Sequence, residues 1–193
     1  MFSKLNHLIS NTIFCSNDEI SFADSLFAFH RFTKNTVILD PDDSDANLIF
    51  VNNGYLRSFY TLAHEEITIN ISSPNEFTTS LLSFFYNDKS KMTIQCLTDC
   101  EIFAISKQNL DSLYSQNPLW QEFGRKIMEK ALVEKEIRIM DQIYLTAEQR
   151  YLKLLKNNPG LIQNCPVKYI ASYLGIHPES LSRIRRSAFP NNC

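Results

Sequence analysis

The 193-residue sequence predicts an α+β fold, with strands in the N-terminal half and helices in the C-terminal half. Short β-branched runs separated by turn residues occupy residues 20–106, which is typical of a sandwich or barrel-like β domain. A long segment without proline follows at 119–144, and helical segments make up the remainder. We therefore expect a β domain at 1–116, a long helix at 117–145 and a small helical domain at 146–193.

The strands of the β domain are predicted from four short segments. They are "NTVILD", "LIFVNNGYLRSFY", "EITINIS" and "KMTIQCLTDCEIFAIS". In the second, Asn52, Asn53 and Gly54 join two apolar runs, and these residue types tolerate the positive φ of a hairpin turn. We expect a hairpin there. In the third segment, alternation places Ile67, Ile69 and Ile71 on one face and Thr68 and Asn70 on the other.

The segment 119–144 has the spacing of a helix with an apolar stripe. The residues of the stripe are Phe123, Ile127, Ala131, Val133, Ile137, Met140 and Tyr144. Such a stripe can pack on the core of its own chain or on a second copy of the same helix. The length of the segment and its charged flank favour the second interpretation, a dimerisation helix.

The C-terminal domain has the local signals of a helix-turn-helix. Thr146 is a plausible N-cap with Gln149 three residues on, and the helix that they open ends before Pro159-Gly160. Two further helices follow, joined at Gly175, which suits the positive φ of a helix end. Pro178 fits the first position of the last helix. Two helices with such a short glycine-containing turn are typical of DNA-binding units.

The last helix separates an apolar side from a basic one. At about 100° per residue, Leu181 and Ile184 face the core, while Glu179 and Arg183 lie on the opposite side. Arginine pairs with guanine edges and a carboxylate accepts from cytosine, so this side could read bases. The residues expected to contact DNA are Lys168, Tyr169, His177, Glu179, Ser180, Ser182, Arg183, Arg185 and Arg186. A solvated basic surface is the alternative.

The distribution of charge favours a polyanionic partner for this end of the chain. Residues 1–146 contain 12 Lys/Arg and 19 Asp/Glu, whereas residues 147–193 contain 7 and 2. The balance therefore changes from -7 to +5. A basic domain on an acidic body is typical of nucleic-acid-binding proteins.

Other classes of protein have little support. The five cysteines (15, 96, 100, 165 and 193) are scattered and indicate reduced thiols, and the proximity expected for Cys96 and Cys100 is weak support for a metal site. We expect no cofactor. No nucleophile–base pair or phosphate-binding glycine loop suggests an enzyme. Without a signal peptide or membrane-spanning run, we expect a cytoplasmic protein.

Three segments together resemble the Crp/Fnr family of bacterial transcription regulators, in the branch common in Bacteroidetes. They are "FGRKIMEKALVEKE", "QRYLKLLKNNPGLIQ" and "KYIASYLGIHPESLSRIRR". The resemblance implies an N-terminal β-roll like that of cyclic-nucleotide-binding proteins, a dimerisation helix and a C-terminal helix-turn-helix. It also implies a β-roll that senses an effector.

The sequence departs from the family at the effector site. Members that bind cyclic AMP have a Gly-Glu pair and, about ten residues on, an arginine for the phosphate; here these places fall near Thr79-Ser80 and Ser90-Lys91. Lys89 or Lys91 could supply a charge but not the fork of an arginine. Cyclic AMP is therefore not expected to bind in the usual way. Cys15 is the only cysteine near the N-terminus, whereas an iron–sulfur cluster needs several, so we expect no cluster. The isolated histidines do not exclude a haem ligand.

Two differences concern DNA. Pro178 stands where some members have an arginine, so base reading would depend on Glu179 and Arg183. After Arg186 we expect no C-terminal wing hairpin.

Our main hypothesis is a homodimeric regulator that binds double-stranded DNA, with RNA polymerase and an unidentified small effector as further partners and no membrane. The alternative is a ligand-sensing or protein-interaction module that does not bind DNA.

Overall fold

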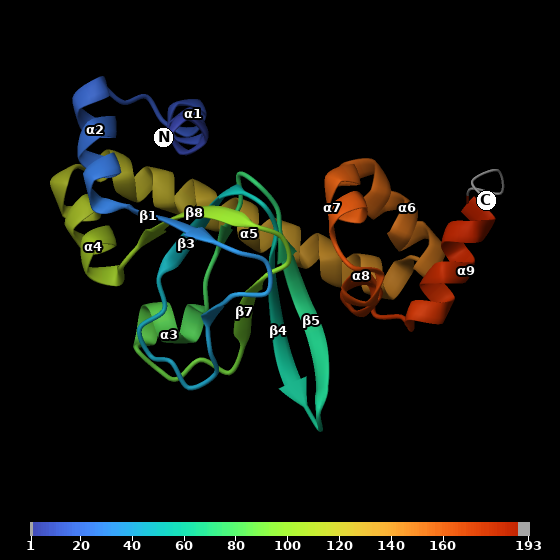
Figure 1. Cartoon of the computed structure of the whole chain (residues 1–193). Helices are drawn as coiled ribbons and strands as arrows, with labels where there is room; N and C mark the ends of the chain where they lie inside the picture. The colour runs from blue at the N-terminus through green and yellow to red at the C-terminus, as the bar shows by residue number, and fades with distance from the viewer. Residues whose placement is uncertain (1, 189–193) are drawn as a thin grey trace.

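Two antiparallel four-stranded sheets form a β-roll in the N-terminal half of the chain (Figure 1). One sheet has the strand order β1-β8-β3-β6 and the other the order β2-β7-β4-β5. The strands are β1 (Ala28–Phe32), β2 (Val37–Leu39), β3 (Leu48–Asn53), β4 (Leu56–Leu62), β5 (Glu65–Ser72), β6 (Phe77–Thr78), β7 (Thr93–Cys96) and β8 (Cys100–Ile105). The structure is a computed structural model and describes residues 2–188.

Helices precede, interrupt and follow the roll. They are α1 (Ser3–Thr12), α2 (Asn17–Leu26), α3 (Leu81–Tyr86), α4 (Lys107–Gln116), α5 (Pro118–Tyr144), α6 (Ala147–Asn157), α7 (Pro159–Asn164), α8 (Val167–Leu174) and α9 (Pro178–Ala188). The sequence patterns did not predict α1, α2 or α3. A capping box between Ser16 and Glu19 opens α2, and Leu5 and Ile9 of α1 are buried against the roll.

The core of the roll is aromatic and aliphatic. Phe50 of β3 and Phe103 of β8 are paired in register and fully buried, and Phe103 also pairs with Phe29 of β1. Trp120 and Phe123, at the start of α5, meet edge to face, and Phe123 lies against Phe77 of β6. The roll and the first turns of α5 therefore form one packed unit.

The hairpin predicted at Asn52–Gly54 is wrong. Strand β3 pairs with β6 and β8, whereas β4 pairs with β5 and β7, so the chain crosses from one sheet to the other at this point. Gly54 does have a positive φ of +87°, but it serves a crossing in which its Cα lies against the backbone of Asp99. A local turn signal identifies the turn and not the partner of the strand that leaves it.

The hairpin of this region is formed by β4 and β5. Its turn contains Ala63 and His64, both at positive φ, and neither residue type is a strong sequence signal for such a turn. The predicted alternation of β5 also fails near the turn, because Ile67 is 43% exposed while Thr68 is buried. Figure 1 shows the tip of this hairpin extending past the rest of the roll.

The long helix α5 runs from the roll to the helical unit (Figure 1), and the prediction of one helix over this segment is confirmed. Its two halves differ in burial. Phe123 is buried and Ile127 packs on the roll core, but Val133, Ile137, Met140 and Tyr144 are exposed in the single chain. The first half of α5 therefore packs on the core of its own chain, which was one of the two interpretations of the apolar stripe.

The helical unit α6–α9 contains the two helices that were expected on either side of Gly175. The predicted capping box between Thr146 and Gln149 opens α6, and Gly175 ends α8 at a φ of +70°. Helix α6 ends at Asn157, before Pro159-Gly160 as predicted, and Pro159 occupies the first turn of α7, where a missing N–H is tolerated. The predicted fold class, a β-roll followed by a long helix and C-terminal helices, is confirmed. Within residues 2–188, no helix combines the length and the apolar character needed to cross a membrane.

The roll and the helical unit share a hydrophobic core. Leu97, in the turn between β7 and β8, is 1% exposed and belongs to the same buried cluster as Leu161, Ile170 and Leu181. Ile71 of β5 is in this cluster too, and Tyr55 packs against it. The contact between the two halves of the chain is therefore apolar at its centre.

The crossing at Gly54 gives a testable prediction. A Cβ at this position would clash with the Asp99 carbonyl oxygen and would stand at a φ that L-residues rarely adopt. Gly54→Ala should therefore lower the free energy of unfolding by about 2 kcal/mol or more, measured by urea denaturation. Ala63→Gly is the matched control, since it relieves a positive φ and should not destabilise. Equal stability of Gly54→Ala and the wild type would contradict the crossing.

Candidate nucleic-acid interface

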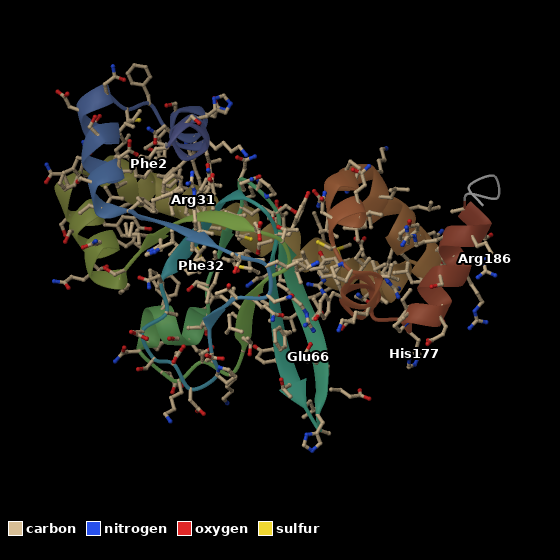
Figure 2. All side chains as sticks on the ribbon, in the orientation of Figure 1. Phe2, Arg31, Phe32, Glu66, His177 and Arg186 are labelled. Atoms are coloured by element: carbon tan, nitrogen blue, oxygen red, sulfur yellow. The ribbon has the colours of Figure 1, made fainter. Side chains whose placement is uncertain are left out.

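Helix α9 presents a polar, basic side to solvent. Leu181 is fully buried against α8, whereas Glu179, Ser182, Arg183 and Arg186 are exposed. Figure 2 shows Arg186 at the end of the molecule farthest from the N-terminal helices. The separation of sides expected from the sequence is present. The contact of these side chains with DNA remains a prediction.

The start of α9 is capped by its own backbone. The His177 carbonyl oxygen accepts from the amides of Ser180 (3.0 Å) and Leu181 (3.1 Å), and the His177 ring is exposed beside this turn. Glu179 lies in the first turn, where a carboxylate complements the helix dipole. The turn from α8 is equally tight, since Gly175 and Ile176 donate to the carbonyls of Ser172 and Ala171. Helices α8 and α9 are consequently held as one unit.

The arginines of α9 have no acidic partner among the described residues. Ion pairs of the structure involve other cations, and Arg183, Arg185 and Arg186 are in none of them. Lys168, at the start of α8, is exposed, and its Nζ lies 4.6 Å from the centre of the Tyr169 ring. Their positive charge is thus available to an external anion.

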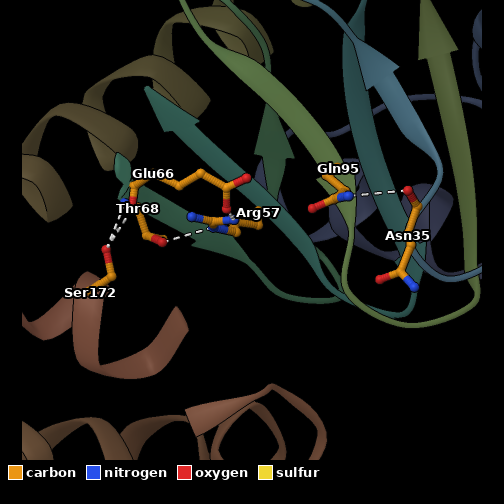
Figure 3. A network of polar contacts seen from close by, with 6 residues as sticks. All are labelled: Asn35, Arg57, Glu66, Thr68, Gln95 and Ser172. Atoms are coloured by element: carbon orange, nitrogen blue, oxygen red, sulfur yellow. Dashed lines mark hydrogen bonds and ion pairs between the residues drawn. The ribbon is translucent and has the colours of Figure 1, made fainter. Parts of the chain in front are cut away.

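Tyr169 has a different environment from the other predicted contact residues. The guanidinium of Arg57, on β4, lies 3.9 Å from the centre of the Tyr169 ring and 4.0 Å from that of Phe59. Arg57 is 0% exposed; its Nε donates to Thr68 Oγ1 (2.8 Å) and its Nη1 to Glu66 Oε2 (2.6 Å). In this structure Tyr169 therefore docks α8 on the roll (Figure 3 shows the polar part of this network).

A second arginine makes a similar contact one helical turn further along α8. The guanidinium of Arg138, on α5, lies 3.9 Å from the centre of the Tyr173 ring and donates to the carbonyl oxygens of Ile69 and Tyr173. Burial lowers the pKa of Arg138 and raises the pKa of Tyr173. Ser172, between the two tyrosines, accepts from the Thr68 amide at 2.9 Å.

Sequence reasoning missed the residues of this junction, which are Arg57, Glu66, Thr68, Arg138, Ser172 and Tyr173. One signal was present. Arg57 interrupts an apolar run, "YLRSFY", at a position that becomes fully buried, and a buried cation requires partners. The identity of those partners depends on the pairing of β4 with β5 and on the docking of α8, which the sequence pattern does not contain.

Two of the residues predicted for an effector site, Ser80 and Ser90, contact each other through their hydroxyl groups. Ser80 and Ser90 are both buried, and the Ser90 hydroxyl donates to the Ser80 hydroxyl at 3.1 Å. The backbone of Ser90 exchanges two hydrogen bonds of 2.8 Å with Asp42 and Asp43. The Thr79 hydroxyl has no partner among the described residues. At this place the buried side chains of Ser80 and Ser90 offer hydroxyl groups to each other, and neither is the carboxylate or the guanidinium that the resemblance implies for the ribose and the phosphate of a cyclic nucleotide.

The two lysines considered as substitutes for the phosphate-binding arginine are at the surface. Lys89 is exposed and forms an ion pair with Asp42 at 3.6 Å, and Lys91 is exposed as well. Solvent-exposed ion pairs of this kind contribute little to stability.

Cys96 and Cys100 lie next to each other, as expected, at the ends of β7 and β8. A hydrogen bond between the two thiols raises the pKa of Cys96 and lowers that of Cys100. Cys15, Cys96, Cys100 and Cys165 are free thiols, while Cys193 lies outside the described residues. Residues 2–188 contain no group of three His, Cys, Asp or Glu side chains suited to a metal ion.

The β-roll, the long helix and the C-terminal helices occur in the same order in solved structures of Crp/Fnr-type regulators. Residues 29–117 match the family model of the cyclic nucleotide-binding domain. Solved structures of similar fold are regulators of the Crp/Fnr type. No curated protein matches the chain by sequence.

Three of these structures illustrate the similarity. The catabolite activator protein of Thermus thermophilus is 21% identical over 92% of this chain and 84% of its own, with a TM-score of 0.56. The c-di-GMP responsive global regulator CLP of Xanthomonas campestris is 17% identical over 91% and 93%, with a TM-score of 0.68. A Crp/Fnr-family transcriptional regulator structure from Eubacterium rectale is 17% identical over 91% and 84%, with a TM-score of 0.66. Identities this low establish the shared fold.

Glu76, in the loop before β6, places a carboxylate at the junction of the roll with α5 and α8, near Glu134 and Tyr173. Burial raises its pKa, and Glu134 of α5 adds to the effect, although the Ser73 amide donates to its Oε2 at 2.9 Å. A carboxyl group whose pKa is raised on folding binds more protons in the folded state. Stability should therefore fall as the pH rises above the ordinary value of 4.5.

Replacing this carboxyl group should reduce the pH dependence. Glu76→Gln keeps an oxygen for the Ser73 amide and removes the titrating proton, so the decline in the free energy of unfolding above pH 4.5 should become shallower. Urea unfolding at a series of pH values measures it. Glu65→Gln removes the same charge from an exposed position and is the control. An unaltered slope in Glu76→Gln would show that Glu76 does not contribute.

Proposed function

We propose that the protein is a sequence-specific DNA-binding transcription regulator of the Crp/Fnr type. The observation that carries the proposal is the exposed side of α9, on which Arg183 and Arg186 have no acidic partner among the described residues and Glu179 and Ser182 lie beside them. This side belongs to a helix-turn-helix, whose second helix enters the major groove in known complexes. Its arginines can read guanine through bidentate hydrogen bonds.

The remaining predicted contact residues have roles that follow from their positions. Lys168, Ser180 and Arg185 flank the reading side, and His177 lies at the turn, so these residues suit contacts to phosphates. Tyr169 lies beside Lys168, but its ring is covered by Arg57. We therefore assign Tyr169 to the docking of α8 before any contact with DNA.

We further propose a homodimer formed by the second half of α5. Apolar side chains on this half are exposed to solvent; they include Leu132 (69%), Ile139 (62%) and Ile143 (71%). Leu132 and Ile139 are one heptad apart, the repeat of paired helices. Water contact of so much apolar surface is unfavourable, and a second copy of α5 would remove it. Two reading helices about 34 Å apart would then match a near-palindromic site.

The β-roll is the proposed regulatory part. The closed Ser80–Ser90 contact favours an effector other than cyclic AMP bound in the usual way, or regulation without a small molecule. RNA polymerase is the proposed further partner, and the cytoplasm the proposed location. The alternative remains a sensing or protein-interaction module whose helix-turn-helix does not engage DNA.

The salt dependence of DNA binding distinguishes these functions. Neutralisation of phosphates releases counterions, so the affinity for a random duplex should fall steeply and linearly on logarithmic axes as the salt concentration rises. Fluorescence anisotropy with a labelled duplex measures it. Affinity that is absent, or flat with salt, favours the module that does not bind DNA.

Arg183 should be responsible for part of the sequence preference. Once a site has been selected from a random pool, Arg183→Ala should weaken binding to that site by about 1–3 kcal/mol and relax the preference at one base position. Lys168→Ala is the comparison, because loss of a phosphate contact should weaken selected and random duplexes equally and reduce the salt slope by about 1. Equal losses on both duplexes for Arg183→Ala would contradict its base-reading role.

The dimer can be tested on the exposed half of α5. A double variant, Leu132→Glu with Ile139→Glu, places four carboxylates in the proposed seam and should raise the dimer Kd by at least about 100-fold. Sedimentation velocity over a concentration series measures the shift to monomer. Tyr86→Glu, a similar change at an exposed aromatic residue of α3, should leave the dimer intact. Dimers of unchanged Kd in the double variant would exclude this seam.

A further inference from the structure

The β4–β5 hairpin is held against α8 by side chains and backbone from both partners. The Thr68 amide donates to Ser172 Oγ at 2.9 Å, and this hydroxyl in turn lies 3.5 Å from the Glu66 carbonyl oxygen (Figure 3). Ser172 therefore joins the free edge of β5 to the middle of α8. The bond is local, but it fixes which residues of β5 and α8 face each other.

Arg57 completes its surroundings only when α8 is in place. Two of its donors are used within the hairpin, by Thr68 and Glu66, and Phe59 of its own strand covers one face of the guanidinium. The other face is covered by Tyr169, which comes from α8. Loss of that ring would remove the cation–π contact on this face of the guanidinium.

Arg138 repeats this arrangement from the opposite direction. It extends from α5, donates to the Ile69 carbonyl oxygen of β5 and lies over Tyr173. Tyr169 and Tyr173 are four residues apart and so lie on one face of α8. The adjacent face contributes Ile170 and Leu174 to the shared core, against which both tyrosines also pack. Each tyrosine thus meets an arginine from a different element, and both arginines are bonded to β5.

We propose that Arg57 and Arg138 are positioning residues for the DNA-reading helix. They hold α8 on β5 through Tyr169 and Tyr173, and the tight turn at Gly175 transfers this position to α9. The inference rests on the proposed function for the role of α9. The contact between hairpin and α8 can be tested separately from it.

The arrangement has a direct consequence for regulation. Both arginines depend on β5, and the tip of the β4–β5 hairpin projects from the roll with Tyr60, Leu62 and Ile67 exposed (Figure 1). Any movement of the hairpin would displace Thr68 and Ile69, and with them the two contacts to α8. The hairpin therefore links the roll to α8 through both arginine contacts.

Two pairs of variants test the proposal in the full-length chain. Tyr169→Leu removes the ring that covers Arg57, whereas Tyr169→Phe keeps it and removes only the hydroxyl. Arg57→Gln removes the buried cation, whereas Arg31→Gln removes an exposed one that pairs with Glu101 on the far sheet. Far-UV circular dichroism verifies that each variant is folded.

The first measurement is amide hydrogen exchange and needs no DNA. Tyr169→Leu and Arg57→Gln should exchange at least tenfold faster in β5 and on α8, while peptides of the roll core around Phe103 stay protected. Tyr169→Phe and Arg31→Gln should resemble the wild type. Unchanged exchange in both Tyr169→Leu and Arg57→Gln would overturn the positioning contact, whatever the chain does with DNA.

The second measurement compares a selected with a random duplex. Misdirection of α9 should weaken the selected site about tenfold or more and the random duplex less than about twofold, because the basic side chains remain. If Tyr169→Phe loses as much affinity as Tyr169→Leu on both duplexes, Tyr169 is a DNA contact and its positioning role is rejected. A wild type that binds neither duplex rejects the proposed function, and the exchange data alone then decide the hairpin contact. Ser172→Ala, a milder change, replaces either variant if it does not fold.

Discussion

The placement of one buried cation, Arg57, determines how the two halves of this chain meet. A guanidinium removed from water needs hydrogen-bond acceptors and polarisable surfaces on every side. The roll supplies Thr68, Glu66 and Phe59, and the helical unit supplies Tyr169. Both halves therefore contribute contacts to Arg57, although its Nη2 is buried without a hydrogen-bond partner among the described residues. Apolar contacts around Leu97 form the buried centre of the junction, and the directional contacts of Arg57 fix how the roll and the helical unit are oriented.

The predicted effector site of the roll contains a contact between two buried serine hydroxyls, Ser80 and Ser90. Binding of a cyclic nucleotide requires a guanidinium for the phosphate and a carboxylate for the ribose hydroxyl. A buried site in which those two charged groups had no partner would be unfavourable when empty. Here two serine hydroxyls bond to each other and to the neighbouring backbone, whereas the Thr79 hydroxyl has no partner among the described residues. This segment therefore encloses a neutral contact at the place where the resemblance predicts a cyclic phosphate.

Much of the fold could be predicted because its signals are local. The helix of α5, the capping box at Thr146 and the turn at Gly175 each depend on residues within a few positions of one another. Strand pairing is not local: Asn52–Gly54 looked like a hairpin, yet β3 and β4 belong to different sheets. For the site, exposure of the basic side of α9 followed from helical periodicity. The junction did not, because Arg57 and Tyr169 are over a hundred residues apart and no pattern relates them.

The shared core has a consequence for how this architecture can be divided or recombined. Tyr55, Ile71 and Leu97 of the roll complete the packing of Leu161 and Ile170. A fragment that begins at α6 would leave that apolar surface in water, and a foreign roll joined to these helices would need side chains of matching shape at three separate places. The packed unit around the C-terminal helices therefore includes the β7–β8 turn and the β4–β5 hairpin of the roll. A division of the chain between two consecutive residues cannot keep that unit whole.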